Sequence, residues 1–212
     1  MPSVTRKPTR TRQARRKAVV ADMLAAVEAL LEEGETFTSL SVERLITQAG
    51  MARSTFYVYF EDKGSLLLAL AEDVVAQLVE AAGAWWSLPS DLEEPDVEKA
   101  LRGIIDVYQR HSTVWSSLVD AATYDPKVRD AFDAVVGNAA AGLTKHIRAG
   151  QKAGYIRAEV DPKRTALWLT WMTERGLYQL TPKASPSEID KLCAAQTEIV
   201  WRTLYADAPS RR

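Results

Sequence analysis

The sequence is poor in the residues that form disulfides and metal centres. Among 212 residues there is one cysteine, Cys193, and there are two histidines, His111 and His146. A single cysteine excludes an intramolecular disulfide, and the three residues show no metal-ligand spacing. Neither histidine has a carboxylate or a second histidine at catalytic or metal spacing within its helix, so both are expected at surface or capping positions. We therefore expect no metal, no cofactor and no catalytic residue, with Cys193 as a small buried hydrophobe.

Long apolar runs are also missing. No stretch approaches the roughly 20 apolar residues that a membrane helix needs. The basic N-terminal segment is not followed by an apolar signal core, because Asp22 and Glu28 interrupt it. These absences predict a cytoplasmic protein without a membrane partner. The 47% hydrophobic content nevertheless predicts a folded chain with a substantial core.

Charge is unevenly distributed, although the net charge is only −1. Residues 1–17 contain no acidic residue and seven basic ones: Arg6, Lys7, Arg10, Arg12, Arg15, Arg16 and Lys17. Since the whole chain has 27 basic and 28 acidic residues, the remainder has 20 against 28. A basic tail on an acidic body is typical of segments that bind polyanions. We expect residues 1–15 to form a flexible arm that follows a DNA backbone or enters a minor groove. A disordered tail that only improves solubility is the alternative.

Residues 41–63, SVERLITQAGMARSTFYVYFEDK, predict two short helices joined by a tight turn. Leu45 and Ile46 belong to one apolar helix face, and Ser41 precedes that helix as an N-cap. Gly50 stands where the first helix should stop, and glycine accepts the left-handed conformation of a sharp turn. An ordinary helical hairpin with a solvated polar face would show the same spacing.

The second helix of this pair is predicted to carry the DNA contacts. Phe56 and Phe60 should anchor it to its partner helix and turn Arg53 outward, where the guanidinium can donate two hydrogen bonds to a guanine. The nearby hydroxyl groups could reach bases or phosphates, and Lys63 is expected on a phosphate. The predicted DNA-binding residues are Arg12, Arg15, Arg16, Ser41, Arg53, Ser54, Thr55, Tyr57, Tyr59 and Lys63.

The remaining chain predicts further helices and no strand. Three helix starts are marked by a capping side chain followed by proline, namely Asp125-Pro126, Asp161-Pro162 and Ser185-Pro186. One helix should run from near Arg16 to Gly34 and another from Lys63 to about Trp86. Others are expected near 96–110, 112–122, 126–150, 161–180 and 186–206. The predicted fold is all-α with about nine helices. It comprises a helix-turn-helix domain over 16–64, a ligand-binding and dimerisation domain over 65–206, and a tail over 207–212.

All six tryptophans fall in the second predicted domain: Trp85, Trp86, Trp115, Trp168, Trp171 and Trp201. Each alone is more often a core residue than a ligand contact. As a group, however, such large side chains pack poorly around a shared centre unless something fills the gap. Apolar gaps between helices with a few polar anchors bind small molecules.

The segment 166–180, ALWLTWMTERGLYQL, carries two distinct faces. Thr170 and Thr173 lie on one face, and Trp168 and Met172 lie on roughly the opposite one. We predict a pocket on the first face and a partner subunit on the second. The predicted ligand-binding residues are Tyr108, Trp115, Phe132, Thr170, Trp171, Thr173, Glu174 and Leu177. Glu174 and Arg175 could form a buried ion pair or a pair that only stabilises the domain.

Residues 54–63, STFYVYFEDK, closely resemble the T-F-Y-x-Y-F-x-x-K signature of TetR-family transcriptional regulators. The preceding LSVERLITQAGMARST resembles the helix-turn-helix of that family, with Ala52 where a capping serine is frequent and Gly64 where glutamate is usual. TALWLTWMTERGLYQL and the later EIVWRTLYA are similar to the C-terminal region of the EthR-like branch. In that branch asparagines stand at the positions of Thr170 and Thr173, so a hydrogen-bonding anchor is kept but the same ligand is not implied.

This resemblance implies a homodimeric repressor that binds a double-stranded, palindromic DNA operator and is released by a small hydrophobic effector. One recognition helix reads too few base pairs to specify an operator, so helix-turn-helix proteins usually bind as two-fold dimers. The last two helices are the candidate interface, with the contributors Trp168, Met172, Cys193, Trp201 and Leu204. A helical ligand-binding or scaffolding protein without DNA activity is the main alternative. A small helical enzyme lacks a convincing nucleophile–base pair or metal set.

Overall fold

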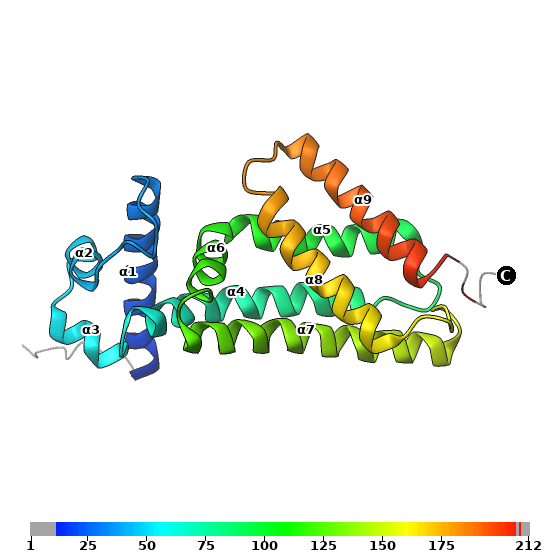
Figure 1. Cartoon of the computed structure of the whole chain (residues 1–212), viewed down its shortest axis with the longest axis horizontal. Coiled ribbons are helices and arrows are strands. Elements are labelled where there is room, and N and C mark those ends of the chain that lie inside the picture. The colour runs from blue at the N-terminus through cyan, green and yellow to red at the C-terminus, as the bar shows by residue number, and fades with distance from the viewer. Residues whose placement is uncertain (1–11, 207, 209–212) are drawn as a thin grey trace, which may run out of the picture. The chain divides into compact units, whose positions relative to one another are not determined.

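A computed structural model describes residues 12–206 and residue 208, which form nine α-helices and no strand (Figure 1). The helices are α1 Arg12–Glu32, α2 Val42–Gln48, α3 Arg53–Tyr59, α4 Lys63–Trp86, α5 Glu94–Arg110, α6 Ser112–Ala121, α7 Pro126–Ala153, α8 Pro162–Leu180 and α9 Pro186–Leu204. The predicted all-α class is confirmed. The chain divides into two compact units between Leu70 and Ala71, six residues beyond the predicted boundary after residue 64.

In the first unit, α1 begins earlier than predicted. It starts at Arg12 rather than near Arg16, so Arg12 and Arg15 project from a helix instead of belonging to a flexible arm. Residues 1–11 of the predicted arm lie outside the described residues, as does most of the predicted tail. The core of the unit draws on each of its helices, with fully buried side chains at Met23, Leu30, Leu45, Phe56, Leu66 and Leu67.

The predicted turn between α2 and α3 is confirmed in detail. Ser41 Oγ accepts a hydrogen bond from the Arg44 amide at 3.1 Å and so caps α2. Gly50 has φ of 60°, a left-handed conformation that costs glycine little. Ala52 stands at the N-cap of α3 without a side-chain hydrogen bond, as its methyl group requires. The start of α3 therefore depends on packing rather than on capping.

In the second unit, α7 packs along α8 and α5 packs along α9 (Figure 1). The predicted caps are present, because Asp125 and Asp161 accept bonds from the first-turn amides of α7 and α8, and Ser185 from that of α9. The shared core is formed by apolar residues that include Leu92, Val97, Leu101, Ile147, Ile156, Ala166 and Leu204. No helix among the described residues is long and apolar enough to span a bilayer.

The two histidines occupy different environments. His111 joins α5 to α6, in agreement with the predicted capping position. His146 is 5% exposed, so the prediction of a surface or capping position is wrong for it. Its Nε2 lies 2.8 Å from the Tyr205 hydroxyl, which also accepts a hydrogen bond from Trp85 Nε1 at 3.1 Å. Burial lowers the pKa of His146 from its ordinary value, and a bond to the Trp86 carbonyl opposes that shift in part.

Candidate functional site

The short helix α3 presents one face to the core and one to solvent. Phe56 and Phe60 are buried, with ring centroids 5.2 Å apart, and they hold α3 against the rest of the first unit. Arg53, Ser54 and Tyr57 are exposed, as predicted. Thr55 and Tyr59 are half-buried, which leaves them less surface for a DNA contact. An exposed basic, hydroxylated and aromatic face on a rigidly anchored helix is suited to reading the edges of bases.

Arg53 is oriented by two neighbours. One guanidinium nitrogen, Nη1, donates to the carboxylate of Glu43 on α2. The guanidinium carbon also lies 5.5 Å from the centre of the Tyr57 ring. Arginine has five N–H donors, so the remaining donors can bind a base while the Glu43 contact persists. Glu43 and Tyr57 therefore fix the guanidinium group of Arg53 on the exposed side of α3.

Lys63, which was predicted to contact a phosphate, makes its hydrogen bonds within the protein in the absence of DNA. Its ammonium group donates hydrogen bonds to the backbone carbonyls of Phe37, Thr38 and Leu40, at 2.9, 2.8 and 2.8 Å. An ammonium group has three N–H donors, so all three are used. Burial lowers the pKa of Lys63. Lys63 therefore ties the link between α1 and α2 to the start of α4, a role that sequence spacing could not reveal.

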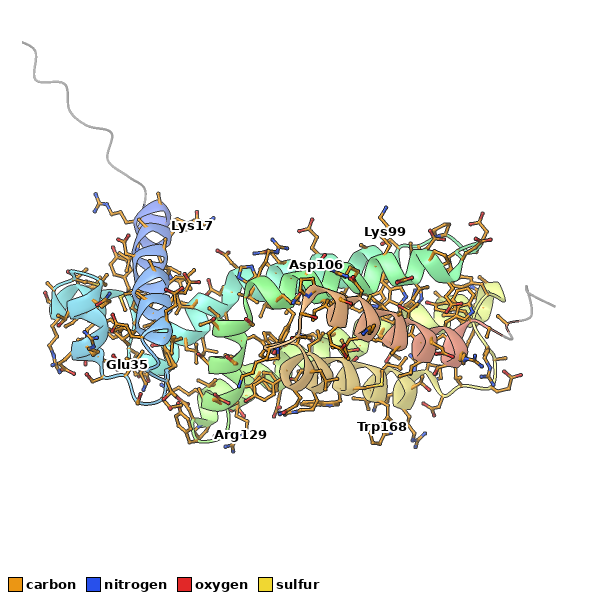
Figure 2. All side chains as sticks on the ribbon, turned by 90° about the horizontal axis from the view of Figure 1, so that it is seen from above. Lys17, Glu35, Lys99, Asp106, Arg129 and Trp168 are labelled. Carbon is orange, nitrogen blue, oxygen red and sulfur yellow. The ribbon has the colours of Figure 1, made fainter. Side chains whose placement is uncertain are left out.

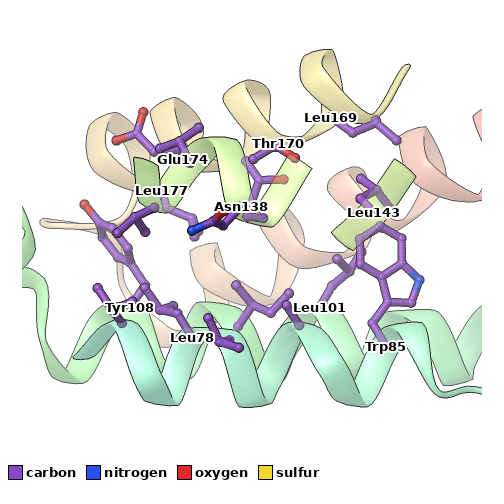
Figure 3. A pocket seen from close by; sticks show the side chains of 18 of the residues that line it. Leu78, Trp85, Leu101, Tyr108, Asn138, Leu143, Leu169, Thr170, Glu174 and Leu177 are labelled. Carbon is purple, nitrogen blue, oxygen red and sulfur yellow. The ribbon is translucent and has the colours of Figure 1, made fainter. Parts of the chain in front are cut away.

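The second unit contains a partly open cavity of about 220 Å³ (Figure 3). Helices α4 to α8 all contribute side chains to its wall, and most of these are apolar or aromatic. Six of the eight predicted ligand-binding residues line it: Tyr108, Trp115, Thr170, Thr173, Glu174 and Leu177. The predicted assignment of this face of α8 to a pocket therefore agrees with the geometry.

Two of the predicted ligand-binding residues do not line the cavity. Phe132 packs behind it, with its ring centroid 5.8 Å from Trp115 and 6.1 Å from Trp171. Trp171 lies on the outer side of α8 and is 37% exposed. Helix geometry explains this error, because at about 100° per residue Trp171 is turned about 120° away from Leu177, outside the arc that the cavity-lining residues of α8 share.

The sequence prediction missed the contributions of α4 and α7. Leu78, Trp85 and Trp86 on α4 and Asn138 and Leu143 on α7 line the cavity. The apolar spacing along α4 was visible, but such a stripe does not distinguish a filled core from a cavity wall.

One end of the cavity contains buried polar atoms that have no hydrogen-bond partner. These atoms are the Tyr108 hydroxyl, the Trp115 indole nitrogen and both carboxylate oxygens of Glu174. Glu174 Oε2 lies 3.7 Å from Nε of Arg175, whose side chain is half-exposed. The predicted pair is thus one buried carboxylate beside a solvated cation. Burial raises the pKa of the Glu174 carboxyl, while Arg175 and then Trp115 act in the opposite direction.

Both units of the chain match known protein families. Residues 23–70 match the family described as bacterial regulatory proteins, tetR family, and residues 97–206 match the family described as transcriptional regulator EthR, C-terminal domain. The chain belongs to the TetR family, in its EthR-like branch. It is a transcriptional regulator with a DNA-binding helix-turn-helix and not an enzyme.

Two relatives illustrate how far this TetR-family similarity extends. The HTH-type transcriptional regulator EthR of Mycolicibacterium smegmatis is 25% identical over 216 residues, covering 97% of each chain. The EthR of Mycobacterium tuberculosis is 26% identical over 166 residues, covering 78% of this chain and 76% of that protein.

Solved structures share the TetR-family fold. A TetR-family regulator from Rhodococcus sp. has a TM-score of 0.68 at 21% identity, covering 88% of this chain and 98% of that one. The regulator PfmR from Thermus thermophilus has the same TM-score, 0.68, at 16% identity, covering 85% of this chain and 97% of that one. Identities this low establish the fold and leave the ligand and the operator open.

Most of the residues predicted to form a dimer interface on α8 and α9 pack within their own chain instead. Cys193 and Leu204 are buried within their own protomer, where the Cys193 thiol donates to the Glu98 carbonyl at 3.7 Å. Met172 and Trp201 also pack against that core. Of the five predicted contributors only Trp168, at 78% exposure, projects fully into solvent (Figure 2). The other exposed apolar residues on the two helices are Leu167, Trp171, Leu180 and Ile199.

Proposed function

We propose that this TetR-family regulator is a homodimeric repressor that leaves a palindromic operator when a small, largely apolar ligand occupies its cavity. The cavity in the EthR-like unit carries this proposal, because a concave and mostly apolar space with a few polar groups is the kind of site that binds small molecules. The chromosome is the expected target, so the expected site of action is the cytoplasm.

Dimerisation is supported by the exposed apolar surface of α8 and α9. Trp168, Leu180 and Ile199 expose large apolar side chains to solvent, and an interface with a second copy would cover them. A two-fold dimer would offer two copies of α3 to two half-sites, as a palindrome requires.

Release requires that the ligand distinguishes two conformers. It must bind more tightly to the conformer whose recognition helices do not fit successive major grooves, because a ligand shifts an equilibrium only by its difference in affinity. A coupling of about 1–3 kcal/mol would change operator affinity roughly 5- to 150-fold.

The test combines operator selection with a block of the cavity. Bound sites are selected from random duplex DNA, and compounds are then screened for release of the purified full-length protein. Thr173→Trp should keep operator binding and lose the response, because the indole would occupy the cavity. Lys99→Trp, on the exposed surface of α5, is the matched control. An unchanged response in the Thr173 variant would place the effector site elsewhere. Failure to retain any duplex would instead favour a ligand-binding protein without DNA activity.

A further inference from the structure

The cavity has a polar end and an apolar end (Figure 3). Glu174 and the Tyr108 hydroxyl lie near one end, while Trp85, Leu143 and Leu169 lie toward the other. The ring of Trp115 lies beside that of Tyr108, with centroids 6.2 Å apart. Tyr108, Trp115 and Glu174 all line this one cavity.

Glu174 is the unusual member of this group. The residue is 8% exposed, and neither of its carboxylate oxygens accepts a hydrogen bond. Nε of Arg175 lies 3.7 Å from the carboxylate, and Arg175 and the Trp115 side chain both favour its charged form. A buried charge that lacks hydrogen bonds destabilises the folded protein. A donor supplied by a ligand would remove that destabilisation.

We propose that the effector carries a basic nitrogen, and that the protonated nitrogen binds the Glu174 carboxylate while an apolar body fills the rest of the cavity. This inference rests on the ligand-binding function proposed above and specifies its chemical class. The rings of Tyr108 and Trp115 favour the same cation, because aromatic faces attract ammonium groups. The apolar body would lie along Leu101, Leu143 and Leu169.

The same arrangement discriminates against other ligand classes. A carboxylic acid or phosphate would bring a second negative charge to Glu174 and would be repelled. A neutral alcohol could donate one hydrogen bond but could not neutralise the carboxylate. A single positive charge on an apolar body therefore matches the site best.

The experiment compares three probes of similar shape on the full-length protein: 4-phenylbutylamine, 4-phenylbutan-1-ol and 4-phenylbutyric acid. Binding is measured by titration calorimetry and by the fluorescence of the cavity tryptophans. The amine should bind at least about ten-fold more tightly than the alcohol, the difference expected for a charge-assisted hydrogen bond. The acid should bind most weakly.

Glu174→Gln keeps the size of the side chain and removes its charge, so it should abolish the preference for the amine over the alcohol. Glu198→Gln is the matched control, because Glu198 is an exposed residue of α9 that pairs with Arg202. That control should retain the preference. The comparison of probes on the unsubstituted protein stands even if the Glu174 variant folds poorly.

Two outcomes would overturn the inference: equal affinity for the amine and the alcohol, or an amine preference that survives in the Glu174 variant. Neither outcome would contradict the proposed ligand-released repressor. Failure of all three probes to bind would also overturn the inference. The proposed function is judged separately, by whether any screened compound releases the operator.

Discussion

At the scale of single residues, the three charged side chains Arg53, Lys63 and Glu174 have very different roles. Arg53 is exposed and is oriented by Glu43. The ammonium group of Lys63 donates all of its hydrogen bonds to backbone carbonyls, and the buried carboxylate of Glu174 accepts no hydrogen bond within the geometric limits for one. Their sequence neighbourhoods do not distinguish these roles. The hydrogen-bond partners distinguish them: Arg53 keeps donors that can contact a nucleic acid, Lys63 stabilises the fold, and Glu174 can accept a donor from a ligand.

Replacement of Arg53 by alanine tests the recognition helix. If Arg53 reads a base, Arg53→Ala should weaken binding to the selected operator by about 1–3 kcal/mol and random DNA much less. Competition gel shifts at fixed salt measure both. Glu43→Gln is the companion variant and should bind all DNA slightly more tightly, because it removes a negative charge beside the contact. Equal losses on operator and random DNA in Arg53→Ala would reduce Arg53 to a phosphate contact.

Protonation of His146 should destabilise the fold at acidic pH. Its folded pKa lies below the unfolded value of about 6.5, so its stabilising contribution is complete above pH 6.5 and declines as the pH falls toward the folded pKa. Urea denaturation of the wild type and His146→Gln between pH 7.5 and 5 should show a steeper acid loss in the wild type. Other titrating groups, including Glu174, are common to both proteins and cancel in the difference. Parallel profiles would contradict the prediction.

At the scale of secondary-structure elements, the sequence predicted type and order well. Proline after a capping side chain correctly placed the starts of α7, α8 and α9, and the TFYVYF run placed α3, because these signals are local. The start of α1 was predicted four residues late, since the added residues, Arg12 to Arg15, are good helix formers but include no large apolar residue to mark a helix face. The prediction of which faces of α8 and α9 contact a partner subunit was partly wrong. Apolar spacing shows that a face is buried, but not whether the same chain or a second copy buries it.

Two of the three glycines in helix α7 have contrasting surroundings. A Cβ added at Gly142 would lie 2.4 Å from Cζ3 of Trp86, whereas a Cβ at Gly137 would meet nothing within 4 Å. Gly142→Ala should therefore destabilise the protein by about 1–3 kcal/mol through overpacking. Gly137→Ala, the matched control, should stabilise it by about 0.4–1 kcal/mol. Chemical denaturation measures both, and a Gly142 variant as stable as the wild type would show that Trp86 repacks without cost.

At the scale of the whole molecule, the helix-turn-helix, the cavity and the exposed apolar side chains of α8 and α9 lie on different parts of one chain. The helix-turn-helix lies in the first unit, and the cavity lies in the second. The exposed apolar residues of α8 and α9 offer a surface to a second copy. The TetR-family membership established by both units explains why these surfaces occur together.

Dimerisation can be tested at Trp168, the most exposed large apolar side chain of α8. Trp168→Glu should convert dimers to monomers and abolish cooperative binding to paired half-sites, because a charge would be buried in an apolar contact. Sedimentation velocity measures the mass and gel shifts measure the binding. Lys99→Glu, also an exposed charge change, is the control and should remain dimeric. A dimer of unchanged stability in the Trp168 variant would exclude this surface.

The sequence by itself determined the helical class, the order of the helices, the turn at Gly50 and the outward face of α3. Each of these depends on residues a few positions apart, through caps, periodicity and the freedom of glycine. Only the tertiary structure decided the roles of Lys63, which binds carbonyls 23 to 26 residues away, and His146, which contacts a hydroxyl 59 residues away. It also decided which aromatic side chains line the cavity. Such contacts depend on how helices pack, and one-dimensional spacing does not contain that information.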